Sequence, residues 1–148
     1  MNRYATGDGS KPSCDVSRGT YCGGNFLGIQ KNLDYLQGLG MSAIWISPIV
    51  ANTDNGFHGY WAKDLYTINP HFGTEQDLIN LVNACHERDI WVMVDVVANH
   101  VGPVGTDYSS IKPFNSAEHY HDDCTINQDD FLNNQWRVEV NLFKRFYP

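Results

Sequence analysis

Two short apolar runs, each preceded by a helix-like pattern, restrict the fold of this chain more than any other feature of its sequence. The runs cover residues 43–48 (AIWISP) and 90–97 (IWVMVDVV), and neither alternates regularly between apolar and polar positions. Runs of this kind are typical of strands that are buried on both faces of a parallel sheet. The order helix, strand, loop, helix, strand, loop implies parallel strands with crossover helices, so we expect an α/β fold.

The helix before each run is marked by its apolar spacing and by its end signals. Apolar residues recur every three or four positions over residues 26–39, where glycines supply the stop, and this predicts one helix. A second helix is predicted to begin after Thr74, which can cap it, and acidic residues follow that favour the positive end of the helix dipole. Residues 1–24 and 49–73 are predicted to be loops. The apolar stripe of the second helix consists of Leu78, Leu81, Val82 and Cys85.

The charge balance excludes several classes of partner. Ten Lys and Arg residues against seventeen Asp and Glu residues give a formal net charge of −7. Such a field repels polyanions, so neither nucleic acid nor an anionic membrane is expected as a partner, whereas a neutral sugar is compatible with it. No stretch reaches the roughly 20 apolar residues that span a bilayer. Residues 1–5 lead into a polar loop without the apolar segment of a secretory signal.

Cysteine positions favour one small disulfide and no zinc site. Cys14 and Cys22 lie close together in the sequence, across a loop that contains Gly and Ser, and this spacing suits a disulfide. The alternative is a pair of free thiols in a reducing compartment. Cys85 lies on the apolar stripe of the second predicted helix, which favours a core thiol. Zinc is not expected, because no second close pair of Cys or His residues completes a tetrahedral ligand set.

Both predicted strands end in polar or otherwise unusual residues. Ser47 and Pro48 end the first strand, and Asp95, Asn99 and His100 lie at the end of the second. In α/β barrels and open α/β sheets, functional groups gather at the C-terminal ends of the strands. The candidate site therefore comprises these residues and the loop that follows Pro48.

Two segments at these strand ends resemble the α-amylase family, also called glycoside hydrolase family 13. Residues 95–100 (DVVANH) match the first conserved region of the family at every position. Residues 57–61 (FHGYW), with Asp64 and Tyr66 following, resemble the aromatic segment after the second barrel strand. Together, in this order and at this separation, the two segments form a specific combination.

A third segment is similar to the fungal branch of the same family. Residues 21–24 (YCGG), with Cys14 before them, lead into residues 28–36, and residues 39–48 continue the match. The resemblance covers about residues 3 to 135. It implies the N-terminal part of a (β/α)8 TIM barrel, with about strands 2 and 3 and the long loop after strand 3, so that the barrel is incomplete.

The resemblance implies that four side chains contact a sugar: His58, Tyr60, Trp61 and His100. Tyr60 would stack on the ring at the cleavage subsite, and the two histidines would hydrogen-bond its hydroxyls. A pyranose has apolar faces and a rim of hydroxyls, so an aromatic platform with neutral donors suits it. The structural alternative is that the aromatics are ordinary half-buried residues and the histidines satisfied structural ones.

Asp95 and Asn99 match supporting residues of the family. The residue matching Asp95 is not the nucleophile; it pairs with an Arg on a later strand that this sequence lacks. We therefore predict a buried carboxylate without a partner, which tends to be protonated. The residue matching Asn99 is a calcium ligand, and calcium is the cofactor that the resemblance implies. Ca²⁺ takes about six to eight oxygens, and the family's other ligands lie in a segment that is missing or altered here. Asn99 therefore either supplies one ligand or holds its loop through backbone hydrogen bonds.

The carboxyl groups that perform the chemistry in this family are absent from the sequence. A retaining glycosidase uses two carboxyl groups roughly 5 Å apart. In the family, the nucleophilic Asp lies in a Gly-x-Arg-x-Asp segment, the acid is a Glu on a strand, and a third Asp lies in an Asn-His-Asp segment; none of these segments occurs here. A (β/α)8 barrel also takes roughly 200 residues or more. Residues 1–135 are therefore interpreted as the N-terminal portion of the catalytic barrel, including the start of the loop domain after strand 3.

The last residues do not follow the family pattern. Residues 136–148 are interpreted as an atypical tail, of the kind that a misread intron or reading frame produces. The segment that would offer Cys124 a disulfide partner is missing, so Cys124 is expected to be an unpaired thiol.

The resemblance leaves alternatives for function. In the first, the chain represents a secreted, monomeric α-amylase, a retaining hydrolase of α-1,4-glucosidic bonds in starch or glycogen, although this chain is expected to be inactive alone. In the second, it is a non-catalytic fragment with a residual glucan-contact surface, or a poorly folded product. A third alternative is another family-13 enzyme, such as an α-glucosidase or a transglycosylase, but the segment from Cys14 to Gly24 favours the fungal amylase branch.

Overall fold

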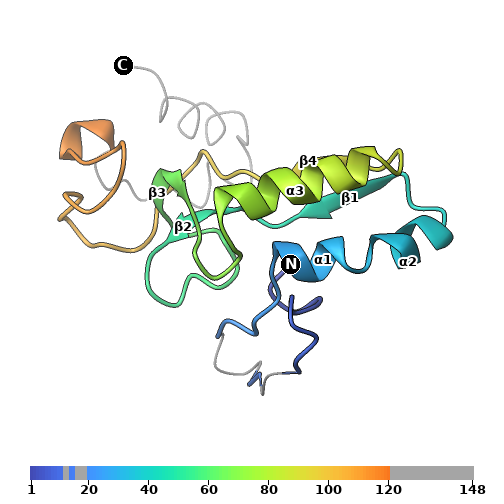
Figure 1. Ribbon diagram of the computed structural model, residues 1–148. Helices are drawn as coiled ribbons and strands as arrows, with labels where there is room; N and C mark the ends of the chain where they lie inside the picture. Colours follow the sequence, from blue (N-terminus) through green and yellow to red (C-terminus); the bar gives the residue numbers. More distant parts are fainter. Residues whose placement is uncertain (12–13, 16–19, 121–148) are drawn as a thin grey trace, which may run out of the picture. The chain divides into compact units, whose positions relative to one another are not determined.

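The computed structural model of the 148-residue chain describes residues 1–11, 14–15 and 20–120 (Figure 1). The chain divides into two units, Met1–Pro103 with Ile111–Pro113, and Val104–Ser110 with Phe114–Pro148. In the second unit, the described part holds a short 3-10 helix, η2 (Ala117–His119). The predictions for Cys124 and for residues 136–148 lie outside the described residues.

The first unit contains a parallel pair of strands. β1 (Ala43–Ile46) pairs with β4 (Trp91–Val94), so that Ala43 lies opposite Trp91 and Ile46 opposite Val94. The helix α3 (Glu75–His86) lies between the two strands in the chain and leads directly into β4. A parallel pair with a helix in its crossover confirms the predicted α/β arrangement.

The start of α3 is set by a reciprocal pair of hydrogen bonds. The Thr74 Oγ1 accepts a bond from the Asp77 backbone N–H at 3.2 Å, and the Asp77 carboxylate accepts one from the Thr74 N–H at 2.8 Å. These bonds satisfy N–H groups that the first turn leaves without helical partners. The predicted cap is confirmed.

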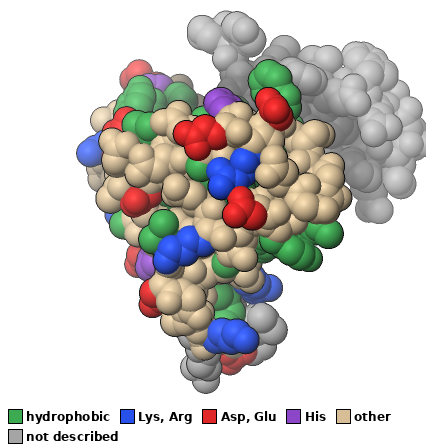
Figure 2. Space-filling view, turned by 45° about the vertical axis from the view of Figure 1, so that its right-hand side comes forward, with side chains coloured by type: hydrophobic (Ala, Val, Ile, Leu, Met, Phe, Trp, Pro, Cys, Tyr) green, Lys and Arg blue, Asp and Glu red, His purple; other side chains and the backbone are tan. Residues whose placement is uncertain are grey.

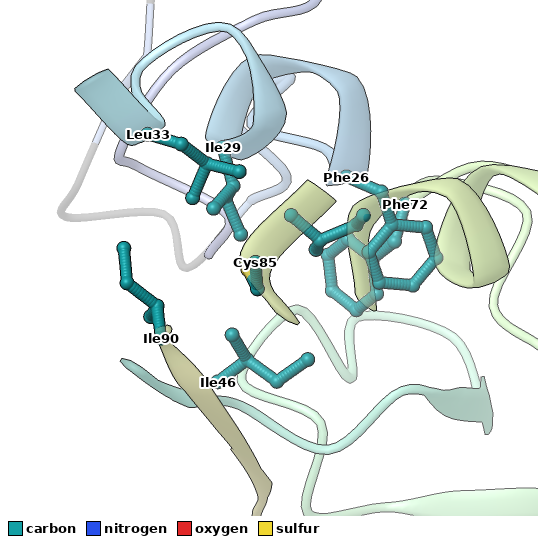
Figure 3. Close-up of a cluster of buried hydrophobic side chains, with 8 residues drawn as sticks. Phe26, Ile29, Leu33, Ile46, Phe72, Cys85 and Ile90 are labelled. Carbon is teal, nitrogen blue, oxygen red and sulfur yellow. The ribbon is translucent and has the colours of Figure 1, made fainter. Parts of the chain in front are cut away.

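Helices cover one face of the β1–β4 pair (Figures 1 and 3). Partly buried strand residues Ile44, Val92 and Val94 pack against the buried cluster beneath the helices. Cys85, from α3, is fully buried there, which confirms its prediction as a core thiol. The cluster consists of Phe26, Ile29, Leu33, Ile46, Phe72, Leu81, Cys85 and Ile90.

The opposite face of the same pair is exposed. Trp45 is 70% exposed, Trp91 is 74% exposed and Met93 is 55% exposed. Successive side chains of a strand point to opposite faces, and the helices of the described residues cover only one of them. The prediction that both strands are buried on both faces is therefore wrong for this chain.

The helix expected over residues 26–39 is divided in two. α1 (Phe26–Gln30) ends before Asn32, and α2 (Leu33–Gly38) begins after it. In a continuous helix the Asn32 N–H would bond to the carbonyl of Gly28, but the Asn32 side-chain amide takes that carbonyl at 2.7 Å. The Asn32 N–H bonds to the carbonyl of Ile29 instead, at 2.9 Å. This side-chain competition for a backbone acceptor accounts for the break.

The segment expected to be one long loop contains an antiparallel hairpin. β2 (Val50–Asn52) pairs with β3 (Ala62–Ile68), with irregularities in the register. The backbone of Lys112 exchanges hydrogen bonds with Lys63 and Leu65 along β3, at 2.8 and 3.0 Å. These strands lack an apolar run because much of the hairpin faces solvent, so the sequence reading missed them.

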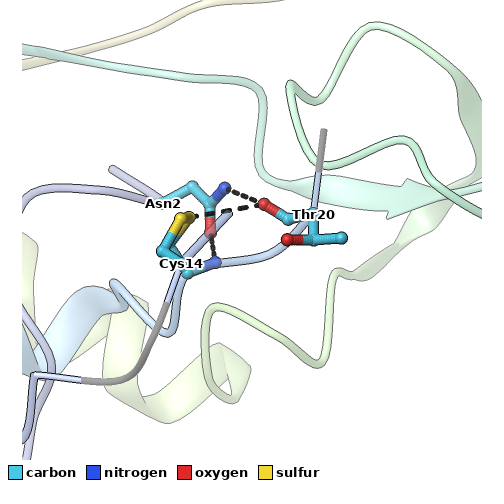
Figure 4. The surroundings of a disulfide bond; sticks show 4 residues. Asn2, Cys14 and Thr20 are labelled. Atoms are coloured by element: carbon cyan, nitrogen blue, oxygen red, sulfur yellow. Dashed lines mark hydrogen bonds between the residues drawn. A yellow bond between two sulfur atoms is a disulfide. The ribbon is translucent and has the colours of Figure 1, made fainter. Parts of the chain in front are cut away.

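A disulfide joins Cys14 and Cys22, which confirms the predicted pair (Figure 4). The buried Asn2 forms two hydrogen bonds next to this disulfide. The Asn2 side-chain oxygen accepts a bond from the Cys22 N–H at 2.7 Å, and the Asn2 side-chain amide donates to the carbonyl of Thr20 at 3.3 Å. The N-terminal residues are thereby tied to the disulfide loop.

Within the described part of the chain, no helix is both long and apolar enough to cross a membrane. On the face drawn in Figure 2, acidic and basic side chains are interspersed.

Candidate functional site

The loop between β2 and β3, residues 53–61, carries the aromatic segment of the candidate site. Asn52, the last residue of β2, binds the last residue of this loop, Trp61. Its side-chain oxygen accepts a bond from the Trp61 N–H at 2.7 Å, and its amide donates to the carbonyl of Val50 at 2.8 Å. The Thr53 N–H bonds to the carbonyl of Trp61 at 2.9 Å, which closes the base of the loop.

A second contact holds the same loop near its middle. The Tyr21 hydroxyl donates to the carbonyl of Gly56 at 3.3 Å and accepts a bond from the Asn69 side-chain amide at 2.9 Å. The Tyr21 ring stacks on His71, with ring centroids 3.7 Å apart. Asn69 is only 1% exposed, so its polar group is buried together with its partner. The segment next to the disulfide thereby fixes the position of the loop.

The structure brings the two family-like segments into direct contact. The Tyr60 hydroxyl donates to the Asp95 carboxylate at 2.8 Å, and the His100 Nε2 lies 2.8 Å from the carbonyl of Tyr60. Asp95 follows β4, and its N–H bonds to the carbonyl of Ile46 at 2.9 Å, which extends the parallel ladder by one residue. Both segments therefore lie at the C-terminal ends of the parallel strands.

The environment of Asp95 differs from the prediction. Its side chain is half-buried, and it accepts the hydrogen bond from Tyr60. The expectation of a buried carboxylate without a partner is wrong, because this face of the sheet is open and the loop after β2 reaches across to it.

The bond to Asp95 further favours the protonated form of the Tyr60 hydroxyl, which is already the form of a tyrosine at neutral pH. This hydrogen bond, then partial burial and then the negative charge of Asp95 raise the pKa of the Tyr60 hydroxyl above its ordinary value. The hydroxyl therefore remains protonated, and it remains a donor to Asp95, at neutral pH.

His58 lies against Tyr60 and is held in its neutral form. The two rings stack with centroids 5.7 Å apart, and the Tyr60 N–H donates to the His58 Nδ1 at 3.0 Å. Burial, and then the charge of nearby His100, lower the pKa of His58. Since Nδ1 accepts a bond, the ring proton of neutral His58 is on Nε2, which is available as a donor. The Trp61 ring meets His58 edge to face, with centroids 4.8 Å apart.

Asn99 is exposed. Among residues 1–11, 14–15 and 20–120, no group of three or more His, Cys, Asp or Glu side chains could hold a metal ion. A single amide oxygen does not hold Ca²⁺, which takes about six to eight oxygens. The described residues therefore do not fit a calcium site by themselves.

Comparison with known protein families matches residues 2–142 to the family described as the catalytic domain of α-amylase. The chain belongs to this family. The α-amylase mde5 of Schizosaccharomyces pombe is 52% identical over 125 residues, which cover 78% of this chain and 24% of that protein. The α-amylase of Saccharomycopsis fibuligera is 46% identical over 141 residues, which cover 87% of this chain and 28% of that protein.

A solved relative shows the same fold. The α-amylase of Malbranchea cinnamomea superimposes with a TM-score of 0.81 at 47% identity, over 87% of this chain and 30% of that one. The chain therefore spans about a quarter of the length of its curated relatives and carries part of a (β/α)8 barrel. The expected family and the expected incomplete barrel are both confirmed.

Three asparagine and tyrosine side chains that hold the site loop were missed from the sequence. Asn52, Tyr21 and Asn69 act through contacts with backbone groups or with each other across 9 to 48 residues. Asn and Tyr residues are common in loops and at strand ends, and no regular spacing in the sequence distinguishes Asn52, Tyr21 and Asn69 from the others. The position of Asn69 at the end of β3, before a proline, is the one available signal.

Proposed function

We propose that this chain forms the glucan-contact part of an α-amylase catalytic domain that cleaves α-1,4-glucosidic bonds inside starch or glycogen with retention. The observation that carries the proposal is the contact of Tyr60 with Asp95 and His100, 35 and 40 residues further along the chain. It gathers an aromatic ring, two imidazoles and a carboxylate at the C-terminal ends of parallel strands, where α/β folds build their sites.

The arrangement suits a neutral sugar. Tyr60 is 41% exposed, and His58 lies against its ring, so the remaining surface can receive the apolar face of a pyranose. His58 Nε2–H supplies a neutral donor for a sugar hydroxyl. Asp95 supports the platform by binding the Tyr60 hydroxyl, and the Trp61 ring meets His58 edge to face.

Hydrolysis requires groups that this sequence does not contain. The Gly-x-Arg-x-Asp segment of the nucleophile and the strand with the acid Glu are absent, and a retaining mechanism needs two carboxyl groups roughly 5 Å apart. The proposal therefore assigns sugar contact to this chain and bond cleavage to the whole domain.

Calcium and an extracellular location belong to the same proposal for the whole protein. The disulfide between Cys14 and Cys22 supports an oxidising compartment, because such bonds rarely persist in the cytosol. Asn99 is the one family-matched candidate ligand on the described residues, so calcium would need further ligands from elsewhere in the domain.

The proposal is tested by titrating the chain with maltohexaose in a calorimeter. Tyr60→Ala should weaken binding about tenfold through loss of the stacking surface. The matched control is Tyr35→Ala on α2, which removes another exposed aromatic ring, 62% exposed, and should leave the affinity unchanged. Equal affinities for the wild type and the Tyr60 variant would overturn the assigned sugar surface.

A reducing-sugar assay on soluble starch tests the assignment of cleavage. The chain alone should release no sugar above the blank, with or without calcium. Calcium-dependent release would show that carboxylates within this chain form the catalytic pair, and the division of roles proposed above would then be wrong.

A further inference from the structure

The aromatic residues of the site loop form a row of ring contacts that begins outside the loop, at Arg3. The guanidinium carbon of Arg3 lies 5.5 Å from the centroid of the Phe57 ring. The Phe57 ring meets the His58 ring edge to face, with centroids 5.1 Å apart, and His58 in turn stacks on Tyr60. Arg3 is therefore connected to the two side chains assigned to sugar contact through Phe57, to which no role has been assigned.

The backbone on both sides of Arg3 is held in place. The Tyr4 N–H bonds to the carbonyl of Met1 at 3.0 Å, which closes a turn. The carbonyl of the buried Asn2 accepts a bond from the Gly24 N–H at 2.9 Å. Gly24 permits this close approach, because a Cβ at its position would lie 2.2 Å from the carbonyl oxygen of Met1. The backbone therefore fixes where Arg3 stands, although its side chain is exposed.

The orientation of the His58 ring depends on Phe57. The Tyr60 N–H donates to the His58 Nδ1 at 3.0 Å. The second side-chain torsion of a histidine is broad, so a bond at one nitrogen allows the ring to tilt about it. The Phe57 ring against the imidazole limits this tilt. The direction of the His58 Nε2–H therefore follows the position of the Phe57 ring.

Arg3 in turn holds the Phe57 ring. A cation over an aromatic face is attracted to the negative charge of that face, and arginine makes such contacts more often than lysine. We propose that Arg3 is a positioning residue of the sugar site: it holds the Phe57 ring, which orients the Nε2–H of His58 toward a hydroxyl of a neutral pyranose. The identity of the ligand rests on the proposed function, whereas the orientation of the His58 ring is measurable without any sugar.

Two other roles of Arg3 are separable from this one. If Arg3 bound the sugar directly, or acted only through its charge, its effect on affinity would not need Phe57. If its contact with Phe57 served stability alone, losing it would leave the affinity of the folded chain unchanged. A double-mutant cycle on Arg3 and Phe57 distinguishes these roles, because residues that act through each other do not have additive effects.

The cycle consists of Arg3→Gln, Phe57→Leu and the double variant, each titrated with maltohexaose in a calorimeter. Arg3→Gln should weaken binding about threefold, since cation–π contacts at exposed sites are weak. Phe57→Leu should weaken it about tenfold, because the edge-to-face contact with His58 is lost as well. In the Phe57→Leu background, Arg3→Gln should change the affinity by less than about 1.5-fold.

Two further variants serve as rescue and control. Arg3→Lys keeps a cation over the ring and should retain most of the wild-type affinity. Lys11→Gln removes the same charge from another exposed residue of the N-terminal segment, so it is the matched control. It should leave the affinity unchanged.

The ring orientation is measured by proton NMR on the sugar-free chain. In the wild type we expect nuclear Overhauser effects between the ring protons of Phe57 and His58, since the two centroids lie 5.1 Å apart. Arg3→Gln should weaken these effects and shift the His58 ring resonances, whereas Lys11→Gln should change neither. A role in stability alone would not move these signals in a folded chain.

Three outcomes would overturn the inference. They are unmoved His58 resonances in Arg3→Gln, an equal loss of affinity from Arg3→Gln with and without Phe57→Leu, and unfolding of Arg3→Gln, which would assign Arg3 to stability. If Arg3→Gln moves the His58 ring but the wild type does not bind maltohexaose, the positioning role is supported and the proposed function is wrong. The two proposals therefore fail separately.

Discussion

Replacing Asn52 by Ala tests whether one side chain holds the loop that carries the candidate site. The variant removes the bond from the Trp61 N–H at 2.7 Å and the bond to the carbonyl of Val50 at 2.8 Å. Each bond contributes about 1 kcal/mol net, and a buried donor left without a partner costs about 1–3 kcal/mol. Since Asn52 is half-buried and water reaches part of the gap, we expect the free energy of unfolding to fall by about 2 kcal/mol.

Urea denaturation followed by circular dichroism measures this change. Asn80→Ala is the matched control, because the Asn80 side chain is exposed on α3, and its side-chain oxygen accepts a bond from the exposed Gln76 amide at 2.9 Å. The control should stay within about 0.5 kcal/mol of the wild type. Under conditions where both variants are folded, Asn52→Ala should also weaken maltohexaose binding, because the loop that presents Tyr60 is released. A free energy of unfolding equal to that of the control would refute the role of Asn52 as the loop's anchor.

Three further perturbations test the core, the disulfide and the imidazole pair. By proton NMR, His58 should titrate below its ordinary value of 6.5, because burial and then the charge of His100 lower its pKa, and His100→Gln should raise it. The folded state then binds fewer protons than the unfolded state, so stability present above about pH 6.5 is lost as the pH falls through the folded pKa; urea midpoints that stay constant on acidification would contradict this. Leu81→Ala, at a site with 0% exposure, should lower the free energy of unfolding by about 2–5 kcal/mol in urea denaturation. Replacing Cys14 and Cys22 by Ser opens a loop with a sequence separation of 8, which should cost about 2.5 kcal/mol on the loop-entropy relation and should be reproduced by adding a reductant to the wild type.

The parallel pair and the start of α3 were predictable because their signals are local. A threonine followed by acidic residues, such as Thr74, is a local signal for the start of a helix. Its capping bonds to Asp77 form within four residues of the chain. The two apolar runs contain β1 and β4, which begin within one residue of the start of each run and end two and three residues before its end. Elements whose stabilising contacts lie within one turn or one run of the chain are the ones that a single sequence reveals.

Elements that depend on competition or on distant partners were not predictable. The apolar spacing over residues 26–39 continues without a gap, yet the Asn32 amide takes the carbonyl of Gly28 and divides the helix. β3 is stabilised by Lys112, more than 40 residues along the chain, and shows no apolar run of its own. In both cases the deciding contact involves a side chain or a backbone segment that periodicity does not describe.

The candidate site was predictable in part, from the position of its residues at strand ends and from the family resemblance. Position at the ends of parallel strands drew attention to Asp95 and His100, and the family resemblance added His58 and Tyr60. The hydrogen bond between Tyr60 and Asp95 followed from neither, because the family resemblance implies an arginine as the partner of Asp95 and the two residues lie 35 positions apart. Only the folded chain shows that the loop after β2 reaches the end of β4.

The prediction that both faces of β1 and β4 are buried was wrong, and the exposed residues show why it was made. Trp45 and Met93 are apolar at positions where this chain leaves them in water, so their residue types match an environment that the described residues do not provide. Selection for stability of this chain alone would favour polar residues on an exposed strand face, since each large apolar side chain left in water forgoes about 1.5–3 kcal/mol of burial free energy. The apolar pattern of β1 and β4 is thus consistent with a complete barrel rather than with the chain in isolation. The prediction that this face is buried is therefore wrong for this chain, although the apolar residue types of β1 and β4 are those of strands buried on both faces.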